Sequence, residues 1–194
     1  SNTPKPLIKV KGKDIFERAI DKPDEMKNFK TKVREFVSDS MNENDQAKKD
    51  VVLLDMFAGI GAMGILASRL KNCLVYANDL NPRSHACLVA NGKLNKGCAD
   101  RLHASNQCGR DFVRRLAAEQ KRFDHVVMNL PATAIEFLDV FRGLLVSDGH
   151  SSGSKDGDAT WWKGDLPLVH CYCFSTSEDR KIDVLRRVAK VIGL

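Results

Sequence analysis

Four polar side chains stand where apolar runs of the sequence end. Asp55 opens DMFAGIGAMG, Asp79 lies in YANDLNP, Asp111 in SNQCGRDF and Asn129 in MNLPATAIEFLDVF. Each segment follows a run that is typical of a buried strand. Because ligands bind at the carboxyl ends of the strands in open parallel sheets, we expect these four side chains to share one site.

The first segment carries a glycine loop. Gly59, Gly61 and Gly64 form a GxGxxG pattern, and Asp79 follows Gly59 by 20 residues. This spacing is typical of dinucleotide-binding domains, in which the acidic residue binds a ribose hydroxyl. The pattern by itself therefore indicates NAD.

Asp55 shifts that interpretation. A dinucleotide presents its pyrophosphate to the helix N-terminus, where a carboxylate at the entrance of the loop would repel it. S-adenosylmethionine has no phosphate and carries a positively charged ammonium and sulfonium, which a carboxylate attracts. The sequence therefore favours S-adenosylmethionine as the cofactor, with Asp55, Gly59 and Gly61 in its site.

Asp79 and Asp111 each have two possible roles. The carboxylate of Asp79 can accept both ribose hydroxyls, although an N-cap ahead of Pro82 is an alternative for which Asn81 is the better candidate. The carboxylate of Asp111 lies where an adenine amine is expected, but it could equally cap its own helix. The sequence leaves both roles of Asp111 open.

Asn129 and Pro131 follow the fourth predicted strand. An amide both donates and accepts hydrogen bonds, so Asn129 can hold a planar ring nitrogen and its neighbours. Pro131 stiffens the turn, and we expect the carbonyl oxygen of Leu130 to accept a further hydrogen bond. This combination favours methyl transfer to a planar nitrogen, where alignment supplies much of the rate. The alternative is that Asn129 and Pro131 simply start the next helix.

The elements that position these residues alternate along the chain. The apolar patterns predict five strands and five helices; the strands cover 51–55, 73–78, 101–105, 123–128 and 168–174, and the helices 62–70, 82–94, 111–121, 132–146 and 177–192. Alternation of this kind predicts an α/β fold with a doubly wound, mostly parallel sheet. We expect residues 51–194 to form this domain.

Two segments lie outside the alternation. Residues 1–50 form an N-terminal extension with one amphipathic helix over 23–41. Residues 147–165 are rich in Ser, Gly and Asp, which predicts a mobile surface loop. We expect the aromatic rings of Trp161 and Trp162 in this loop to fold back onto the domain; a partner contact or a stacking platform is the alternative.

Composition narrows the class of protein. With 194 residues, 43% of them hydrophobic, the chain is long enough for one domain. A net charge of +6 permits a polyanionic partner, but the basic residues are dispersed. No apolar run approaches the roughly 20 residues of a membrane helix. Six cysteines without a CxxC pair indicate a reducing, intracellular compartment, and we expect no metal, because Cys171 and Cys173 lack further ligands at zinc spacing.

Several segments together resemble one family. DMFAGIG, VYANDLNP, GRDF, HVVMNLPATAIEFLDVF and VHCYCFS closely resemble the eukaryotic tRNA guanine N1-methyltransferases that modify position 37 beside the anticodon, over about 51–174. The resemblance implies a Rossmann-like class I methyltransferase fold, S-adenosylmethionine as methyl donor and tRNA as partner. It implies that Asp79 and Asp111 hold the ribose and adenine, and that Asn129 and Pro131 shape a guanine pocket. We expect the cofactor site to comprise Asp55, Phe57, Gly59, Gly61, Asp79, Leu80, Asp111 and Asn129.

The chain also departs from that family. The family's general base is a glutamate in an N-P-R-L-x-T-E-like segment before the first strand, which residues 1–50 lack; the context of Glu35, KVREFV, does not match. We also expect these residues to lack the terminal hairpin of such folds. We therefore expect a monomeric catalytic-domain fragment that binds cofactor but methylates tRNA poorly. The alternatives are a wybutosine-pathway transferase of a 3-amino-3-carboxypropyl group and a non-catalytic RNA-binding domain.

Overall fold

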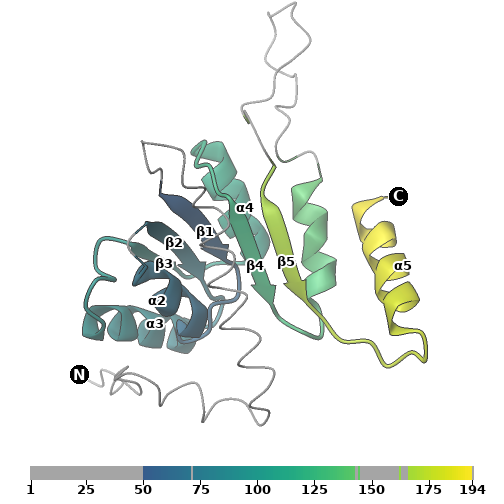
Figure 1. Cartoon of the computed structure of the whole chain (residues 1–194), viewed down its shortest axis with the longest axis horizontal. Coiled ribbons are helices and arrows are strands. Elements are labelled where there is room, and N and C mark those ends of the chain that lie inside the picture. Colours follow the sequence, from purple (N-terminus) through teal and green to yellow (C-terminus); the bar gives the residue numbers. More distant parts are fainter. Residues whose placement is uncertain (1–49, 71, 143, 145–161, 163–165, 194) are drawn as a thin grey trace, which may run out of the picture.

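Parallel strands alternate with helices along the chain, as Figure 1 shows. The computed structural model describes residues 50–70, 72–142, 144, 162 and 166–193. Five strands pair in the order β3-β2-β1-β4-β5 with every pairing parallel. Their bounds are Val51–Asp55 (β1), Cys73–Asn78 (β2), Leu102–Ser105 (β3), His125–Asn129 (β4) and Leu168–Tyr172 (β5).

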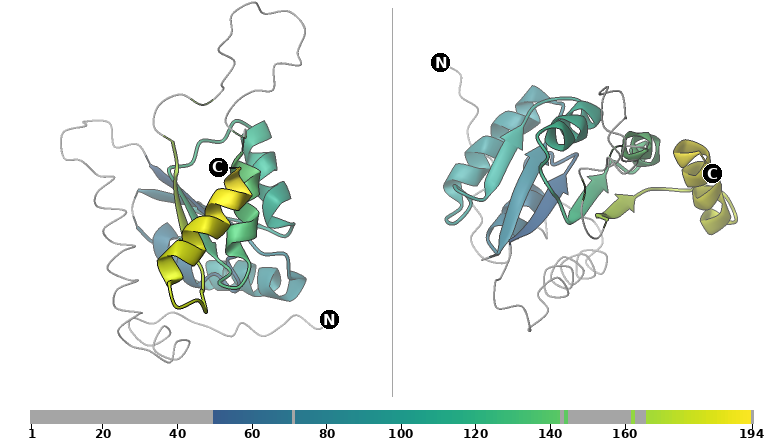
Figure 2. Two further views of the ribbon diagram at one scale, coloured as in Figure 1. Left: turned by 90° about the vertical axis from the view of Figure 1, so that its right-hand side faces the viewer. Right: turned by 90° about the horizontal axis from the view of Figure 1, so that it is seen from above.

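Helices cover both faces of this sheet (Figures 1 and 2). They are α2 (Ala62–Ser68), α3 (Pro82–Leu94), α4 (Gly109–Ala118), the 3-10 helix η1 (Ala134–Phe141) and α5 (Arg180–Ile192). α2 and α3 pack on one face of the sheet, α4 and η1 pack on the other, and α5 packs against η1. The predicted doubly wound, Rossmann-like fold is confirmed. The chain reverses direction across the sheet between β1 and β4, which is where such sheets bind ligands.

Alternating side chains of β1 divide the core in two. Leu54 belongs to the larger apolar cluster, with Phe112 of α4, Met128 of β4 and Ile135 of η1. Leu53 points to the opposite face and packs against the smaller cluster beneath α2 and α3. Because both faces of the sheet are buried, the strands are continuous apolar runs in the sequence.

The bounds of β1, β2 and α3 agree with the prediction. Asn81 is the N-cap of α3: its side chain accepts a hydrogen bond from the Arg83 N–H at 3.0 Å, and Pro82 occupies the first helical position. Most other ends differ by one to three residues. α5, for instance, begins at Arg180 rather than at 177, because the side chain of Asp179 caps it by accepting from the Ile182 N–H.

The helix predicted over 132–146 is present in part, over Ala134–Phe141, and residues 143, 145 and 146 lie outside the described part of the chain. The segment forms the 3-10 helix η1, which ends at Phe141 because Arg142 is extended. Residues three apart eclipse in a 3-10 helix. Two rows at that spacing face the core: Ala134, Phe137 and Val140 form one row, and Ile135, Leu138 and Phe141 form the other.

Trp162 is buried, as predicted for an aromatic that folds back onto the domain. Its ring is 5% exposed and meets the Phe123 ring edge-on, with centroids 5.1 Å apart. The remainder of the predicted loop 147–165, including Trp161, lies outside the described residues, as do the extension 1–49 and its predicted helix. None of the helices in the described part of the chain has the length and apolarity to cross a membrane.

Candidate functional site at the carboxyl ends of the strands

Asp55 ends β1 as a buried carboxylate, 1% exposed. Neither of its oxygens accepts a hydrogen bond of good geometry from a described residue. Burial raises the pKa of Asp55 to about 7; the nearby N–H of Phe57 offsets part of this, the charge of Asp79 adds to it, and the N–H of Gly64 offsets a little more. A buried carboxylate without a partner is costly, and a cationic ligand would relieve that cost.

The glycine loop turns the chain from β1 into α2. Gly59 has a φ of +56°, and a Cβ added there would meet no atom within 4 Å. Gly61, the N-cap of α2, has a φ of +96° and packs directly against Leu88 and Ile65. The loop therefore has open space at Gly59, where a ligand can approach the backbone, and tight packing at Gly61.

Asp79 follows β2 and holds the glycine loop. Its Oδ2 accepts from the Gly59 N–H at 2.8 Å, and its Oδ1 accepts from the Asn81 N–H at 2.9 Å. Asn81 rather than Asp79 caps α3, as predicted. A carboxylate has about four acceptor positions, so Asp79 retains capacity for hydroxyl donors of a ligand. Leu80, the next residue, is 68% exposed.

Asp111 lies in the first turn of α4 rather than at its cap. The N-cap position is Cys108, which makes no side-chain capping bond. The Asp111 side chain is 65% exposed and forms an ion pair with Arg114 at 3.6 Å. Its alternative role as the cap of its own helix is therefore wrong, and the expected contact with adenine stays a prediction.

Asn129 ends β4 and is exposed, next to the turn at Pro131. The Leu130 carbonyl accepts from the N–H groups of Thr133 and Ala134 at 3.0 and 2.7 Å, so the expectation that it accepts a further hydrogen bond is wrong. The Pro131 carbonyl accepts from the Phe174 N–H at 3.1 Å, which ties this turn to the chain after β5. The exposed Asn129 amide is therefore a polar side chain that this turn offers to a ligand.

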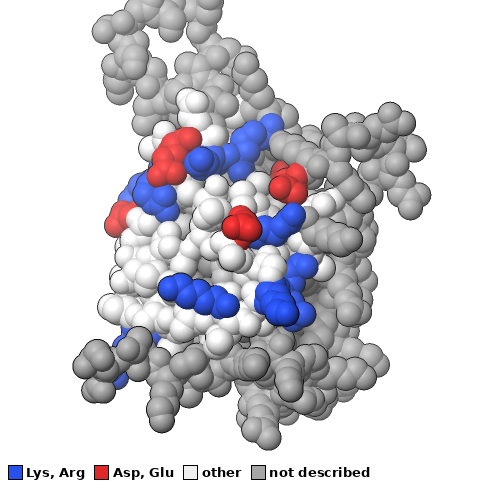
Figure 3. All heavy atoms as spheres, turned by 90° about the vertical axis from the view of Figure 1, so that its left-hand side faces the viewer, with Lys and Arg blue, Asp and Glu red and all other residues white. Residues whose placement is uncertain are grey.

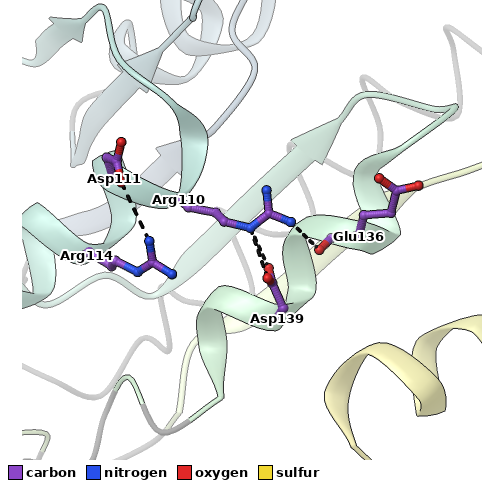
Figure 4. Close-up of polar contacts among 5 residues, drawn as sticks. All are labelled: Arg110, Asp111, Arg114, Glu136 and Asp139. Carbon is purple, nitrogen blue, oxygen red and sulfur yellow. Dashed lines mark hydrogen bonds and ion pairs between the residues drawn. The ribbon is translucent and has the colours of Figure 1, made fainter.

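Arg110 links two sides of the site in a way that the sequence analysis missed. Its Nε donates to both carboxylate oxygens of Asp139 at 2.8 and 3.0 Å, and its Nη2 donates to the Glu136 carbonyl at 2.8 Å (Figure 4). The guanidinium also lies 4.2 Å from the centre of the Phe137 ring, which packs edge-on against Phe57 at 4.9 Å. These contacts join α4, η1 and the loop after β1.

Asn78 is a second residue that the sequence analysis missed. Its buried side chain donates to the carbonyls of Met56 and Gln107 at 3.3 and 3.0 Å and accepts from the Gln107 N–H at 3.1 Å. Asn106 adds bonds to the carbonyls of Asp79 and Leu80 at 2.6 and 3.0 Å. The loops after β1, β2 and β3 are thus held together by amide side chains.

Comparison with known proteins supplies the family. The chain matches the model of the TRM5/TYW2 methyltransferase domain over residues 27–150. It belongs to this family. It is 44% identical to a tRNA (guanine(37)-N(1))-methyltransferase of Phytophthora infestans over 148 residues, which are 76% of this chain and 32% of that protein.

Relatives from other organisms agree. The mouse (Mus musculus) tRNA (guanine(37)-N(1))-methyltransferase is 45% identical over 154 residues, 74% of this chain and 28% of the relative. The chain thus spans about a third of the length of these relatives. Among solved structures, the P. horikoshii TYW2 complex with MeSAdo matches with a TM-score of 0.47 and 21% identity, over 76% of this chain and 48% of that one.

The fold of this methyltransferase domain brings most of the predicted residues to one edge. Asp55, Asp79 and Asn129 stand at or directly after the ends of β1, β2 and β4, three neighbouring regions of the sheet. Asp111 stands in the first turn of α4. An Asn directly before Asp79 was a signal that could have drawn attention to Asn78. Arg110 and Asp139, 29 residues apart, carry no such local signal.

No metal site emerges from the described residues: none of their His, Cys, Asp and Glu side chains group in threes that could hold an ion. The six cysteines are free thiols. Cys171 and Cys173 face the same side, as predicted, and both pack against the larger apolar cluster. Burial raises the pKa of Cys171 to about 11, which keeps this thiol protonated at neutral pH.

Proposed function

We propose that this chain is the catalytic domain of an S-adenosylmethionine-dependent tRNA methyltransferase that methylates N1 of guanine at position 37. The observation that carries the proposal is the buried carboxylate of Asp55, which accepts no hydrogen bond of good geometry from the described residues and lies on the same sheet edge as Asn129. Family membership supports it, and so do the printed names of the relatives at 44 and 45% identity.

The described residues fit S-adenosylmethionine better than a dinucleotide. The Asp55 carboxylate suits an ammonium group, whereas a pyrophosphate beside it would leave two like charges close together in a buried site. Gly59 leaves room beside the loop, and Asp79 has spare acceptor capacity for ribose hydroxyls. In this proposal Phe57, Leu80 and Asp111 complete the site around the nucleoside.

Methyl transfer needs the guanine nitrogen held in line with the methyl group. S-adenosylmethionine would supply a methyl group on a positively charged sulfur. N1 of guanine would form the new bond to the methyl carbon and lose its proton to a base, and the cofactor would leave with the electron pair of the broken carbon–sulfur bond. Asn129 holds the guanine plane through its amide, and Pro131 fixes the turn that carries that amide. Such positioning contributes a large share of the rate, and small misplacements cost about 100-fold.

The test uses the whole gene product that contains this chain, with S-adenosylmethionine and two tRNA transcripts that carry G or A at position 37. Mass spectrometry of the digested nucleosides should find 1-methylguanosine with the G transcript alone. Asn129→Ala should lower the rate by about 100-fold and leave cofactor affinity within tenfold of wild type. No gain of a methyl group on the G transcript would contradict the proposal.

The same spectra address a second candidate reaction. The family description covers both TRM5 and TYW2, which keeps open the transfer of a 3-amino-3-carboxypropyl group from the same cofactor. Both reactions use the cofactor site around Asp55, but they transfer different carbons. A nucleoside that gains the larger group instead of methyl would favour the second candidate.

A further inference from the structure

Two aromatic side chains are exposed beside Asn129. Tyr172, the last residue of β5, is 53% exposed, and Phe174 is 58% exposed. Their rings meet edge-on, with centroids 6.0 Å apart. Large exposed aromatic rings are unfavourable in water, and in binding proteins they often stack on a planar ligand.

Strand register places Tyr172 on the same face as Asn129. The two residues are partners in the parallel pairing of β4 with β5, so their side chains are neighbours on one face of the sheet. Met128 and Cys171, one residue earlier on each strand, both pack into the larger cluster on the opposite face. Nearer the start of β4, His125 meets His170 at 3.2 Å, which demonstrates that side chains of these strands reach one another on this face.

The backbone around Phe174 is fixed from both sides. Its N–H donates to the Pro131 carbonyl at 3.1 Å, and its carbonyl accepts from Arg187 Nη1 of α5 at 2.9 Å. Arg187 in turn pairs with Asp183 at 3.6 Å. The exposed rings therefore sit on a chain segment that is anchored to the turn of the guanine pocket, and ordering them for a ligand costs little conformational entropy.

We propose that Tyr172 is a stacking residue for the purine base that Asn129 holds, with Phe174 supporting the Tyr172 ring at its edge. An amide that binds the edge of a base and an aromatic ring that covers its face recognise different features of an unpaired purine. Adjacent strands lie about 4.8 Å apart, so a base bound at Asn129 lies within reach of the neighbouring ring. This inference rests on the proposed function, because the base is the guanine of that reaction.

Binding of an anticodon stem-loop with 2-aminopurine at position 37 tests the inference. The whole gene product is used, with S-adenosylhomocysteine present, and fluorescence quenching reports stacking of the base. Tyr172→Ala should weaken quenching and, in separate turnover assays with S-adenosylmethionine and the G transcript, raise the KM for tRNA by about 5- to 100-fold, the range expected for one aromatic–base stack. Tyr172→Phe should retain the wild-type values, because it keeps the ring. Cofactor affinity should not change in either variant.

Leu168→Ala is the matched control, because Leu168 lies on the same face of β5, is 54% exposed and stands at the opposite end of the strand. Quenching and KM for Tyr172→Ala that equal those of this control would overturn the inference. A parallel loss of thermal stability and cofactor affinity in Tyr172→Ala would also overturn it, as would a changed sedimentation coefficient of the RNA-free protein. Absence of methyl transfer by the wild type would instead refute the proposed function, and this inference with it.

Discussion

Asp55 combines a cost for folding with a use in binding. The carboxylate is buried and accepts no hydrogen bond of good geometry within the described part of the chain, and burial raises its pKa to about 7 from an ordinary value of 3.8. Between these pH values the folded chain keeps a proton that the unfolded chain has released. The contribution of Asp55 to stability therefore falls as pH rises from about 4 to about 7, and it stays at its lowest above pH 7.

Asp55→Asn should remove this penalty, because an amide does not ionise. At pH 8 the cofactor-free variant should be more stable than wild type by up to about 4 kcal/mol, given roughly 1.4 kcal/mol for each unit of the pKa shift. The gain should shrink as the pH is lowered towards 4. Thermal denaturation of both chains between pH 4 and pH 8 measures it.

The exposed Asp100 offers a control for the loss of one negative charge. Asp100→Asn should change stability by less than about 0.5 kcal/mol throughout this pH range. If Asp55→Asn behaved like this control, or destabilised the chain at pH 8, the buried carboxylate of Asp55 would not destabilise the folded chain.

At the scale of elements, Gly61 determines how α2 meets the sheet. An alanine there would hold φ at an unfavourable +96° and place its Cβ 2.6 Å from Leu88 Cδ1 and 2.8 Å from Ile65 Cδ1, both of them buried. Gly61→Ala should destabilise the chain by about 2–4 kcal/mol, from backbone strain together with overpacking. Urea denaturation measures the difference.

Gly97→Ala separates the two causes. Gly97 has a similar φ of +87°, but an added Cβ there meets nothing within 4 Å. Its cost should be backbone strain alone, about 1–2 kcal/mol. Equal losses at the two glycines would show that packing against Leu88 contributes nothing.

The contact between Arg110 and Asp139 should join α4 to η1. The pair is partly buried, with side chains 29% and 41% exposed, and the guanidinium also lies over Phe137. A double-mutant cycle with Arg110→Ala and Asp139→Ala should give a coupling energy of about 1–2 kcal/mol. The more exposed pair between Arg114 and Asp111, at 58% and 65%, is the control seen in the same view (Figure 4) and should give less than about 0.5 kcal/mol. Similar coupling in both pairs would contradict the assigned role of Arg110.

Sequence patterns predicted those helices and strands whose ends are marked by residues close to them in the sequence. α3 was predicted to the residue because an Asn–Pro pair marks its start, and β1 and β2 are apolar runs with sharp polar ends. A helix was predicted around η1, but its 3-10 type was not, because its apolar residues are dense enough to fit more than one helical period. The start of α5 was missed because Ser177 and Asp179 can both act as caps, and contacts decide between them.

In the candidate site, too, some residues could be predicted from the sequence and others could not. Asp55, Asp79 and Asn129 could be predicted because each ends a strand, and the topology of a parallel sheet brings strand ends together. The network of Arg110 could not be predicted, because its partners lie 26 and 29 residues away and no local pattern pairs them. The engaged Leu130 carbonyl was missed because the turn ahead of η1 brings two N–H donors, those of Thr133 and Ala134, to it at once.

At the scale of the whole molecule, the distribution of charge does not by itself indicate a surface that binds a nucleic acid. The chain carries a net charge of +6, but on the face drawn in Figure 3 the basic side chains are spread among neutral and acidic ones. The arrangement of polar groups along the carboxyl edge of the sheet is more specific. Its central consequence is that the glycine loop serves a cation-bearing nucleoside cofactor rather than a dinucleotide.

Isothermal titration calorimetry with the chain of 194 residues tests that consequence most directly, with S-adenosylmethionine and NAD as ligands at pH 8. S-adenosylmethionine should bind wild type with micromolar affinity and lose at least tenfold in Asp55→Asn, while NAD should give no heat with wild type. Binding of NAD to wild type, or equal affinity of S-adenosylmethionine for both chains, would contradict the role assigned to Asp55.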